Sequence, residues 1–396
     1  MTDAVLVLNV GSSSVKFALY ALPSLDPLCR GGIDSVGTER IRLRVAGIRS
    51  DALAEAKPPA GDHASVAEWL LDLLGKRLSD IELLGAGHRV VHGGTAFADP
   101  VLVDGRVLEK LDGFIPLAPN HQPQNLAAIR AVAHAAPDLP QVACFDTAFH
   151  RTQPRQAQHF ALPRSMTDAG IVRYGFHGLS YEYLADALPE FAGACANGRV
   201  ILAHLGHGAS LCALRERRSV ATTMGFTALD GLVMGTRCGA IDPGVLLHLI
   251  EQRGMTAAAV SDLLYNRSGL LGVSGLSDDL RVLEADGGAD AEEAMNLFAY
   301  RAAREIGSLA AALGGLDILV FSAGIGEHSP SMRARVCAYS AWLGIGLDAG
   351  ANAANRPRIS ATGTAVEVFV IPTDEEITIA RAARALLCSK DRTHRG

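Results

Sequence analysis

A short glycine turn inside an apolar β-hairpin occurs twice in this chain, about half a chain apart. The first copy is Asn9-Val10-Gly11-Ser12, and the second is His204-Leu205-Gly206-His207-Gly208. In both, β-rich apolar residues lead into small residues and then resume, which is typical of a hairpin. A turn without bulky side chains lets backbone N–H groups surround an anion. The repeat therefore predicts a duplicated domain that holds one polyphosphate from two sides, with two ordinary hairpins as the alternative. The polar neighbours Asn9, Lys16 and His204 favour the phosphate interpretation.

The composition is that of a globular protein with full cores. The chain has 396 residues, 49% of them apolar and 20% charged, which suffices for two domains. A net charge of −6 argues against nucleic acid or an anionic membrane as the main partner, so any anion site must be local. We expect no transmembrane span and no secretory signal. Seven cysteines without CxxC spacing predict a cytoplasmic protein with neither disulfides nor zinc.

Strand-like and helix-like segments alternate along the chain, which predicts an α/β fold. We expect the N-terminal domain to comprise residues 1–150 plus 380–396, and the C-terminal domain residues 151–379. A glycine turn is expected at residues 323–326, directly after a strand. The expected helices are Ala64–Ser79, Glu292–Leu313 and Glu375–Leu387, and the expected strands are Gly87–His92, Gln141–Phe145, Asp317–Phe321 and Val366–Ile371.

One candidate chemical group lies at the end of the 87–92 strand. His88 and His92 have the spacing of a helical zinc site, but their β-branched context argues against a helix. Arg89 is the better candidate, because a guanidinium binds phosphate or carboxylate through two parallel hydrogen bonds. A surface arginine is the alternative interpretation.

Further candidates follow other strands and glycine turns. Arg237 lies in a loop of small residues, where it is either a ligand-binding group or a simple loop arginine. Asp146, Asp374 and Glu375 occur where oxygen ligands can bind Mg²⁺, although Glu375 could instead only favour a helix N-terminus. His177 lies in a glycine-flanked turn. Together these residue types are those of phosphoryl transfer.

The chain resembles the acetate kinase family of short-chain carboxylate kinases over essentially its whole length. The motifs that carry the resemblance are LNVGSSSVKFALY, GHRVVHGG, ACFDTAFH, RYGFHG, ILAHLGHGAS, MGFTALDGLVMGTR, FSAGIGEHS and IPTDEE. The resemblance implies two duplicated ribonuclease H-like domains around an interdomain cleft, the fold of sugar kinases, actin and heat-shock chaperones. It also implies a homodimer that uses Mg²⁺, with Mn²⁺ as an alternative ion, and converts ATP and acetate to ADP and acetyl phosphate.

The resemblance also implies roles for single residues. The expected catalytic residues are Asp146, Arg89, Arg237 and His177, of which His177 and Arg237 stabilise the transition state. The expected acyl-substrate residues are Arg89, Val91, His121 and Phe176, and the expected metal-site residues are Asn9 and Glu375. Ser12 belongs to the first phosphate turn. The expected nucleotide-binding residues are Lys16, His204, Gly206, His207, Gly208, Asp279, Leu280, Arg281, Gly324, Ile325 and His328.

Several positions depart from the family pattern. His207 and His328 stand where the family usually has Asn, which affects the preference for the phosphoryl donor. Asn120 and Ala228 replace the usual Leu and Pro near the methyl pocket. The remaining departures are Ala221, Cys238 and Ala240, which stand where the family commonly has Asp, Ser and Asp.

The expected mechanism is direct in-line transfer to a carboxylate that is already an anion, so no covalent nucleophile or general base is needed. A propionate kinase, or a kinase for another short-chain carboxylate, is the nearer alternative function. A non-catalytic nucleotide switch on the same fold is the more distant one.

Overall fold

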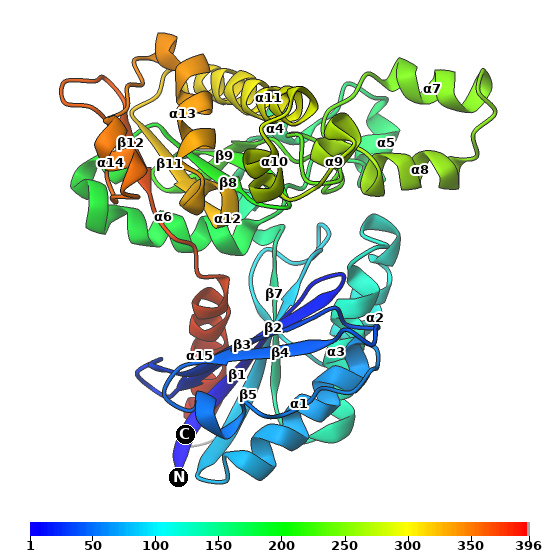
Figure 1. Ribbon diagram of the computed structural model, residues 1–396. Helices are drawn as coiled ribbons and strands as arrows, with labels where there is room; N and C mark the ends of the chain where they lie inside the picture. Colours follow the sequence, from blue (N-terminus) through cyan, green and yellow to red (C-terminus); the bar gives the residue numbers. More distant parts are fainter. Residues whose placement is uncertain (394–396) are drawn as a thin grey trace. The chain divides into compact units, whose positions relative to one another are not determined.

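The computed structural model describes the backbone of residues 1–393, which forms two compact units (Figure 1). Unit 1 comprises Met1–Ala148 and the chain from Asp374 onward, and unit 2 comprises Phe149–Thr373. The boundaries expected from the sequence, at residues 150 and 380, lie close to these positions. Each unit contains one sheet with helices packed on it.

The sheet of unit 1 combines an antiparallel meander with parallel strands. Its order is β4-β3-β2-β1-β5-β7-β6, with β1 antiparallel to β2 and parallel to β5. The parallel pairing continues from β5 to β7, so the carboxyl ends of β1, β5 and β7 meet at one edge. The strands are β1 (Thr2–Val10), β2 (Ser14–Ala21), β3 (Pro27–Asp34), β4 (Arg42–Ala46), β5 (Ile81–Val90), β6 (Val101–Leu102) and β7 (Gln141–Phe145).

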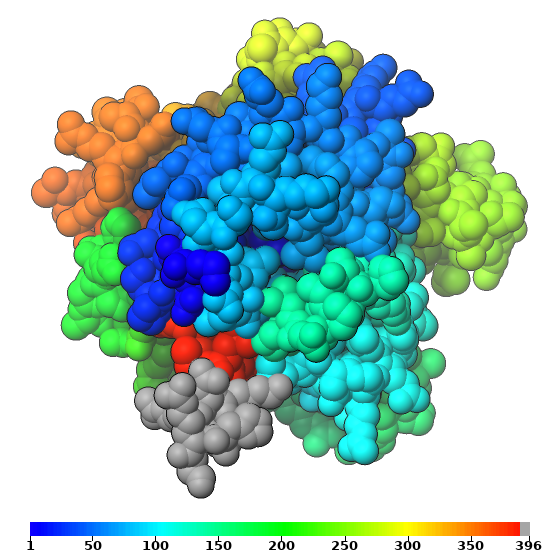
Figure 2. Space-filling view, turned by 90° about the horizontal axis from the view of Figure 1, so that it is seen from below, coloured from blue at the N-terminus to red at the C-terminus, as the bar shows by residue number. Residues whose placement is uncertain are grey.

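Helices cover this sheet, and β5 shows how they approach it. A Cβ atom at Gly85 would lie 2.5 Å from Leu387, and one at Gly87 would lie 2.6 Å from Ile379, so α15 packs closely on these glycines. Ala86 instead belongs to the core that contains α1 and α3 residues. The N-terminal strand and the last helix lie side by side (Figures 1 and 2). The helices are α1 (His63–Arg77), α2 (Gly105–Asp112), α3 (Gln122–Ala135) and α15 (Glu375–Thr393).

Unit 2 repeats the central topology of unit 1. Its order is β10-β9-β8-β11-β12, with β8 antiparallel to β9 and parallel to β11, and β11 parallel to β12. The sequence β3-β2-β1-β5-β7 in unit 1 has the same pattern of directions, which confirms the expected duplicated α/β fold. The strands are β8 (Val200–Leu205), β9 (Ala209–Arg215), β10 (Arg218–Thr222), β11 (Ile318–Ser322) and β12 (Glu367–Val370).

The helices of unit 2 include the long helix α11, which buries Phe298, Ala302, Ile306 and Leu309. Its C-terminal cap is Gly314, which is in the left-handed region. Helix α6 lies on the core formed by β8 and β11. The helices are α4 (Arg155–Gln158), α5 (Arg164–Asp168), α6 (Gly178–Ala192), α7 (Pro243–Glu251), α8 (Ala257–Asn266), α9 (Gly269–Ser274), α10 (Leu280–Asp286), α11 (Ala289–Leu313), α12 (Ala323–His328), α13 (Pro330–Tyr339) and α14 (Ala349–Ala353).

Two local predictions were wrong. The expected strand Gly87–His92 ends at Val90, because the amides of Val91 and His92 donate to the side chains of Asn125 and Gln122 (3.0 and 3.2 Å) and not to a neighbouring strand. The expected glycine turn at residues 323–326 is instead part of helix α12. Its last carbonyls, which lack partners within the helix, accept hydrogen bonds from the buried Arg333.

Candidate functional site

The first glycine turn connects β1 to β2 in unit 1. Gly11 N donates to Ser14 O at 2.8 Å, which closes the hairpin. Asn9 and Lys16 are cross-strand partners beside this turn, so their side chains share one face of the sheet. Asn9 is buried and Lys16 is exposed, which leaves the lysine ammonium available to an anion in solution.

Two carboxylates at the start of α15 contact Asn9. Asn9 Nδ2 donates to Glu375 Oε2 at 3.0 Å and to Glu376 Oε1 at 3.1 Å. Burial raises the pKa of Glu376, and the neighbouring Glu375 carboxylate raises it further. A cation bound between these groups would offset both the burial of the Glu376 charge and its repulsion from Glu375. The β1 end and the α15 start are therefore electrostatically suited to a positive ion.

The donors in this place fit a hard divalent cation. The two glutamate carboxylates are oxygen ligands, as Mg²⁺ prefers, and the Asn9 amide lies beside them with its nitrogen toward both carboxylates and its oxygen toward Arg89. Among the side chains of residues 1–388, no group of three His, Cys, Asp or Glu has the arrangement of a complete metal cage. An ion bound through one or two carboxylates, waters and a substrate phosphate needs no such cage.

Arg89 and Asp146 form a buried ion pair at the ends of β5 and β7. Arg89 Nε donates to Asp146 Oδ1 at 3.1 Å, and Nη2 donates to Asp146 Oδ2 at 2.6 Å. Burial would lower the pKa of Arg89, but the Asp146 carboxylate outweighs it, so this pKa lies above its usual range. Arg89 Nη1 lies 3.5 Å from Asn9 Oδ1. The ion pair therefore fixes the guanidinium of Arg89 beside Asn9, which contacts both glutamates.

The other residues expected at the acyl substrate divide between the units. Val91 is buried beyond the end of β5. His121 directly precedes α3. The side chain of Gln122, the first residue of α3, accepts a hydrogen bond from His92 N at 3.2 Å and donates one to His92 O at 3.1 Å. Those bonds hold the Val91 and His121 segments in one region of unit 1. Phe176 belongs to unit 2.

The second glycine turn lies in unit 2, between β8 and β9. Gly206 N donates to Gly208 O at 3.1 Å. A Cβ atom at Gly208 would lie 3.2 Å from His177 Nε2 and 3.9 Å from Arg237 Nη1. One at Gly206 would lie 3.8 Å from Gly324 N. The absence of side chains in this turn therefore lets an imidazole, a guanidinium and the start of α12 approach it together.

The imidazoles of His177 and His204 stack, with ring centroids 4.1 Å apart and planes 17° apart. His177 is in the left-handed region (φ 58°) immediately before α6. Its Nδ1 hydrogen-bonds Ser210 Oγ at 2.9 Å, and His204 Nδ1 hydrogen-bonds Ser180 Oγ at 2.8 Å. The serines orient both rings, so that Nε2 of His177 is directed toward the glycine turn.

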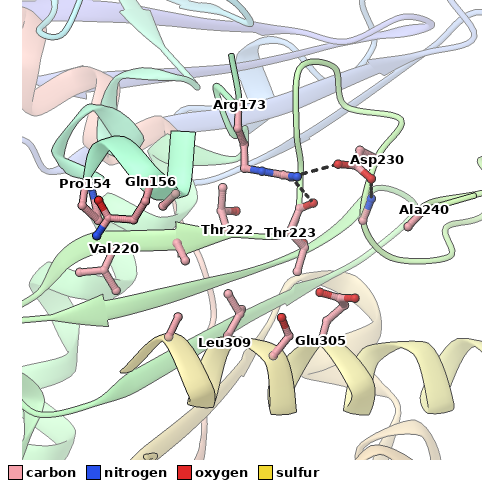
Figure 3. Close-up of a pocket in the computed structure, with 15 residues that line it drawn as sticks. Pro154, Gln156, Arg173, Val220, Thr222, Thr223, Asp230, Ala240, Glu305 and Leu309 are labelled. Atoms are coloured by element: carbon pink, nitrogen blue, oxygen red, sulfur yellow. Dashed lines mark hydrogen bonds and ion pairs between the residues drawn. The ribbon is translucent and has the colours of Figure 1, made fainter. Parts of the chain in front are cut away.

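Arg237 is held by its own loop. Its Nη1 donates to Ala228 O at 3.1 Å. Arg173, four residues before His177, donates to Asp230 at 3.0 Å and to Thr223 O at 3.2 Å (Figure 3). This ion pair links the His177 turn to the Arg237 loop.

A cavity of about 590 Å³ lies beside that ion pair, and Glu305 and Leu309 of α11 line one side of it (Figure 3). Two of the positions that depart from the family pattern, Ala221 and Ala240, line it. None of the residues predicted for the site does so. The cavity therefore adjoins the Arg237 loop without containing the predicted site.

The residues expected at the nucleotide lie in two further segments of unit 2. Asp279 caps α10 by accepting from Arg281 N at 2.9 Å and from the Arg281 guanidinium at 2.6 Å. His207 Nε2 lies 3.1 Å from Asp278 Oδ2, which links the second glycine turn to this segment. Leu280 is buried, so its contribution to a ligand would come from the backbone. Gly324, Ile325 and His328 lie on α12.

Sequence reasoning missed several residues that support these groups. Glu376 could have been found, because it directly follows Glu375 in the acidic run of the last motif. No sequence pattern indicates a role for Ser180, Ser210 or Gln122, because serine and glutamine are common and their partners are distant in the chain. His88 and His92 are both buried, and burial lowers the pKa of each to about 4. They are neutral core groups at neutral pH.

The two duplicated units, each with a glycine hairpin between its first two strands, have the fold of the sugar kinase, actin and heat-shock chaperone superfamily. Residues 4–381 match the model of the Acetokinase family, and the chain belongs to that family. No helix within residues 1–393 combines the length and the apolar character that a membrane crossing requires.

Named relatives agree with this assignment. The chain is 54% identical over 389 residues to the acetate kinase of Rhodopseudomonas palustris strain CGA009, covering 96% of this chain and 98% of the relative. A propionate kinase from Francisella tularensis has a similar structure, with a TM-score of 0.89, 36% identity and coverage of 97% and 99%. The acetate kinase of Porphyromonas gingivalis has a TM-score of 0.84, 38% identity and coverage of 97% and 100%.

Proposed function

We propose that this protein is an acetate kinase, which transfers the γ-phosphoryl group of ATP reversibly to acetate and produces ADP and acetyl phosphate. Membership of the Acetokinase family supports ATP and a divalent metal ion as requirements. The observation that carries the proposal is the Arg89–Asp146 pair beside Asn9 and the two glutamates. It combines a cation for an acceptor anion with oxygen ligands for a metal ion.

The reaction needs neutralisation of charge more than proton transfer. Acetate is an anion at neutral pH, so its oxygen attacks phosphorus without a general base. Arg89 binds and orients the carboxylate, while Arg237 and His177 donate to the oxygens of the transferring phosphoryl group. Since these donors are already held by Asp146, Ala228 and Ser210, little reorganisation is needed during the reaction.

The remaining assignments divide by unit. Lys16 and the first turn would contact the phosphates from unit 1, and Gly206, Gly208, His204 and α12 would bind the nucleotide from unit 2. We propose Mg²⁺ as the ion, held by Asn9 and Glu375, with Glu376 as an additional ligand. When bound, it would neutralise phosphate charge. Asp146 acts mainly by fixing Arg89, because both of its carboxylate oxygens accept from that side chain.

The decisive assay measures ADP formation with and without acetate, with hydroxylamine trapping of the acyl phosphate. We expect ADP only when acetate is present. A series of carboxylates then defines the acceptor. Ala228 and Asn120 reduce the apolar filling of the methyl pocket, and one methylene changes discrimination by only ~1–3 kcal/mol. Acetate should therefore be the substrate and propionate a competent second one.

Replacement of Val91 by Ala should shift the preference further toward propionate, and Ala228→Pro should shift it toward acetate. If propionate is inert and Val91→Ala leaves the acetate-to-propionate ratio unchanged, Val91 does not line the pocket. A higher rate with propionate than with acetate would make this a propionate kinase. ATP binding without any acyl phosphate would indicate a nucleotide switch.

We also propose a cytoplasmic homodimer. All seven cysteines are free thiols, as a reducing compartment maintains them. Helix α7 offers a surface for self-association: it contains no buried residue, and Val245, Leu247 and Ile250 are 40%, 56% and 43% exposed. A mass of twice the 41.5 kDa chain in sedimentation would support the dimer, and a monomer would exclude it.

A further inference from the structure

The side chain of Glu327 on α12 connects two segments that are distant in the sequence. Its Oε1 accepts from Ala323 N at 2.8 Å and from Thr373 N at 3.1 Å, and Ser322 Oγ lies 3.4 Å away. One carboxylate oxygen therefore holds two backbone amides. A charged acceptor makes such hydrogen bonds stronger than a neutral one does.

The first of these amides belongs to the start of the α12 segment. Ala323 has φ 63°, a left-handed conformation that is unfavourable for a residue with a Cβ atom. The bond from its amide to Glu327 helps to hold it there. Gly324 follows directly, and its amide is the one that approaches the second glycine turn. Glu327 thus fixes the backbone that faces the turn.

The second amide belongs to the end of unit 2. Thr373 is the last residue of that unit, and the chain enters unit 1 at Asp374, directly before Glu375 and Glu376. Thr373 Oγ1 also hydrogen-bonds Ser180 Oγ at 2.8 Å, and Ser180 in turn contacts His204 Nδ1 at 2.8 Å. The connecting segment is therefore anchored to α12 and to the stacked histidines.

We propose that Glu327 is a positioning residue that couples the nucleotide to the metal-binding carboxylates. A nucleotide that restrains the Ala323–Gly324 backbone also restrains Glu327, and through it the Thr373 amide, two residues before Glu375. This inference rests on the proposed function, since it takes α12 as part of the nucleotide site and Glu375 as a metal ligand. It gives Glu327 a part in the reaction without contact with the reacting atoms.

Hydrogen exchange of the segment 371–378 tests the coupling without metal. In the unaltered protein, saturating ADP should slow exchange of the Thr373 amide, and Glu327→Ala should remove that effect. Glu284→Ala is the matched control, because Glu284 accepts from Ser329 and Ser331 at the other end of α12 and has no bond to Thr373. Glu327→Gln retains an acceptor oxygen and should restore most of the protection.

Kinetics provide the second readout. Glu327→Ala should lower kcat and raise the divalent-ion requirement by roughly 5- to 150-fold, the usual range for coupled sites. The KM for acetate should change less than about twofold, because Glu327 is not expected to contact the acceptor. If the alanine variant does not fold, Glu327→Asp serves instead, since its shorter side chain cannot reach both amides.

ADP protection of Thr373 that persists in Glu327→Ala, or that is lost equally in Glu284→Ala, would overturn the proposal. A glutamine variant as defective as the alanine variant would also do so. These results are distinguishable from a failure of the proposed function, in which the unaltered protein would form no acetyl phosphate.

Discussion

The two units have the same sheet topology and the same glycine hairpin, yet they surround that hairpin with different chemistry. In unit 1, the groups near the turn are charged and paired: Arg89 with Asp146, and Asn9 with Glu375 and Glu376. In unit 2, they are a pair of stacked imidazoles and an arginine that donates to the neutral groups Ala228 O and Met234 Sδ. Duplication thus supplied the scaffold, and the side chains at equivalent edges diverged.

We infer from this difference that the two units bind different ligands. Carboxylates would repel a polyphosphate unless a cation is bound between them, so the groups of unit 1 suit a metal ion and an acceptor anion. Backbone amides, imidazoles and the Arg237 guanidinium attract phosphate directly, so unit 2 suits the nucleotide. Substitutions of matched residues in the two units test this division.

The largest effect is expected from the two arginines. Arg89→Ala and Arg237→Ala should each lower kcat by about 10²–10³, because each removes a fixed cation from the developing charge. Lysine at either position should recover only part of the rate, since it lacks the planar fork. Steady-state kinetics on variants with unchanged circular dichroism measure this. Near-normal turnover in either alanine variant would remove that arginine from the site.

The carboxylates of unit 1 should separate into two kinds. Asp146→Ala should largely abolish turnover, since it releases Arg89, whereas Glu375→Ala should mainly raise the magnesium requirement. Magnesium titrations of both variants, with Asp72→Ala of the exposed Lys76–Asp72 pair as a control, distinguish the roles. An unaltered magnesium dependence in Glu375→Ala would leave that residue as a helix N-terminal group alone.

Acid should destabilise unit 1 more than unit 2. Burial lowers the pKa of His88, His92 and His150 to about 4 each, and the first two lie in unit 1. Their unfolded pKa is about 6.5, so the unfolded state binds more protons and stability falls as the pH drops from about 6.5 to about 4. At pH 5, each of these histidines should lower the free energy of unfolding by about 2 kcal/mol relative to neutral pH.

Urea unfolding at pH 7.5 and pH 5, followed by hydrogen exchange in each unit, measures this loss. His88→Gln should reduce the acid sensitivity of unit 1, whereas His248→Gln, on the exposed face of α7, should leave it unchanged. Equal acid sensitivity of the two units would show that other groups dominate.

The duplicated α/β fold was predictable from the sequence, because hairpins, buried strands and amphipathic helices are encoded by local patterns, and the family was predictable from the resemblance of eight ordered motifs. Gln141–Phe145 is a strand as predicted, and α11 ends at Gly314 as its glycine pair indicates. The residue types for phosphoryl transfer were also visible, since glycine turns and isolated arginines depart from the ordinary pattern of a core.

Which of those residues contact one another depends on the three-dimensional fold. The pairing of Arg89 with Asp146 depends on the parallel register of β5 and β7, and the Asn9–Glu375 contact joins residues 366 positions apart. The end of β5 at Val90 depends on the side chains of Asn125 and Gln122, which no local pattern near residue 90 reveals. Such contacts are long-range, and their energies come from burial and geometry that local sequence patterns do not encode.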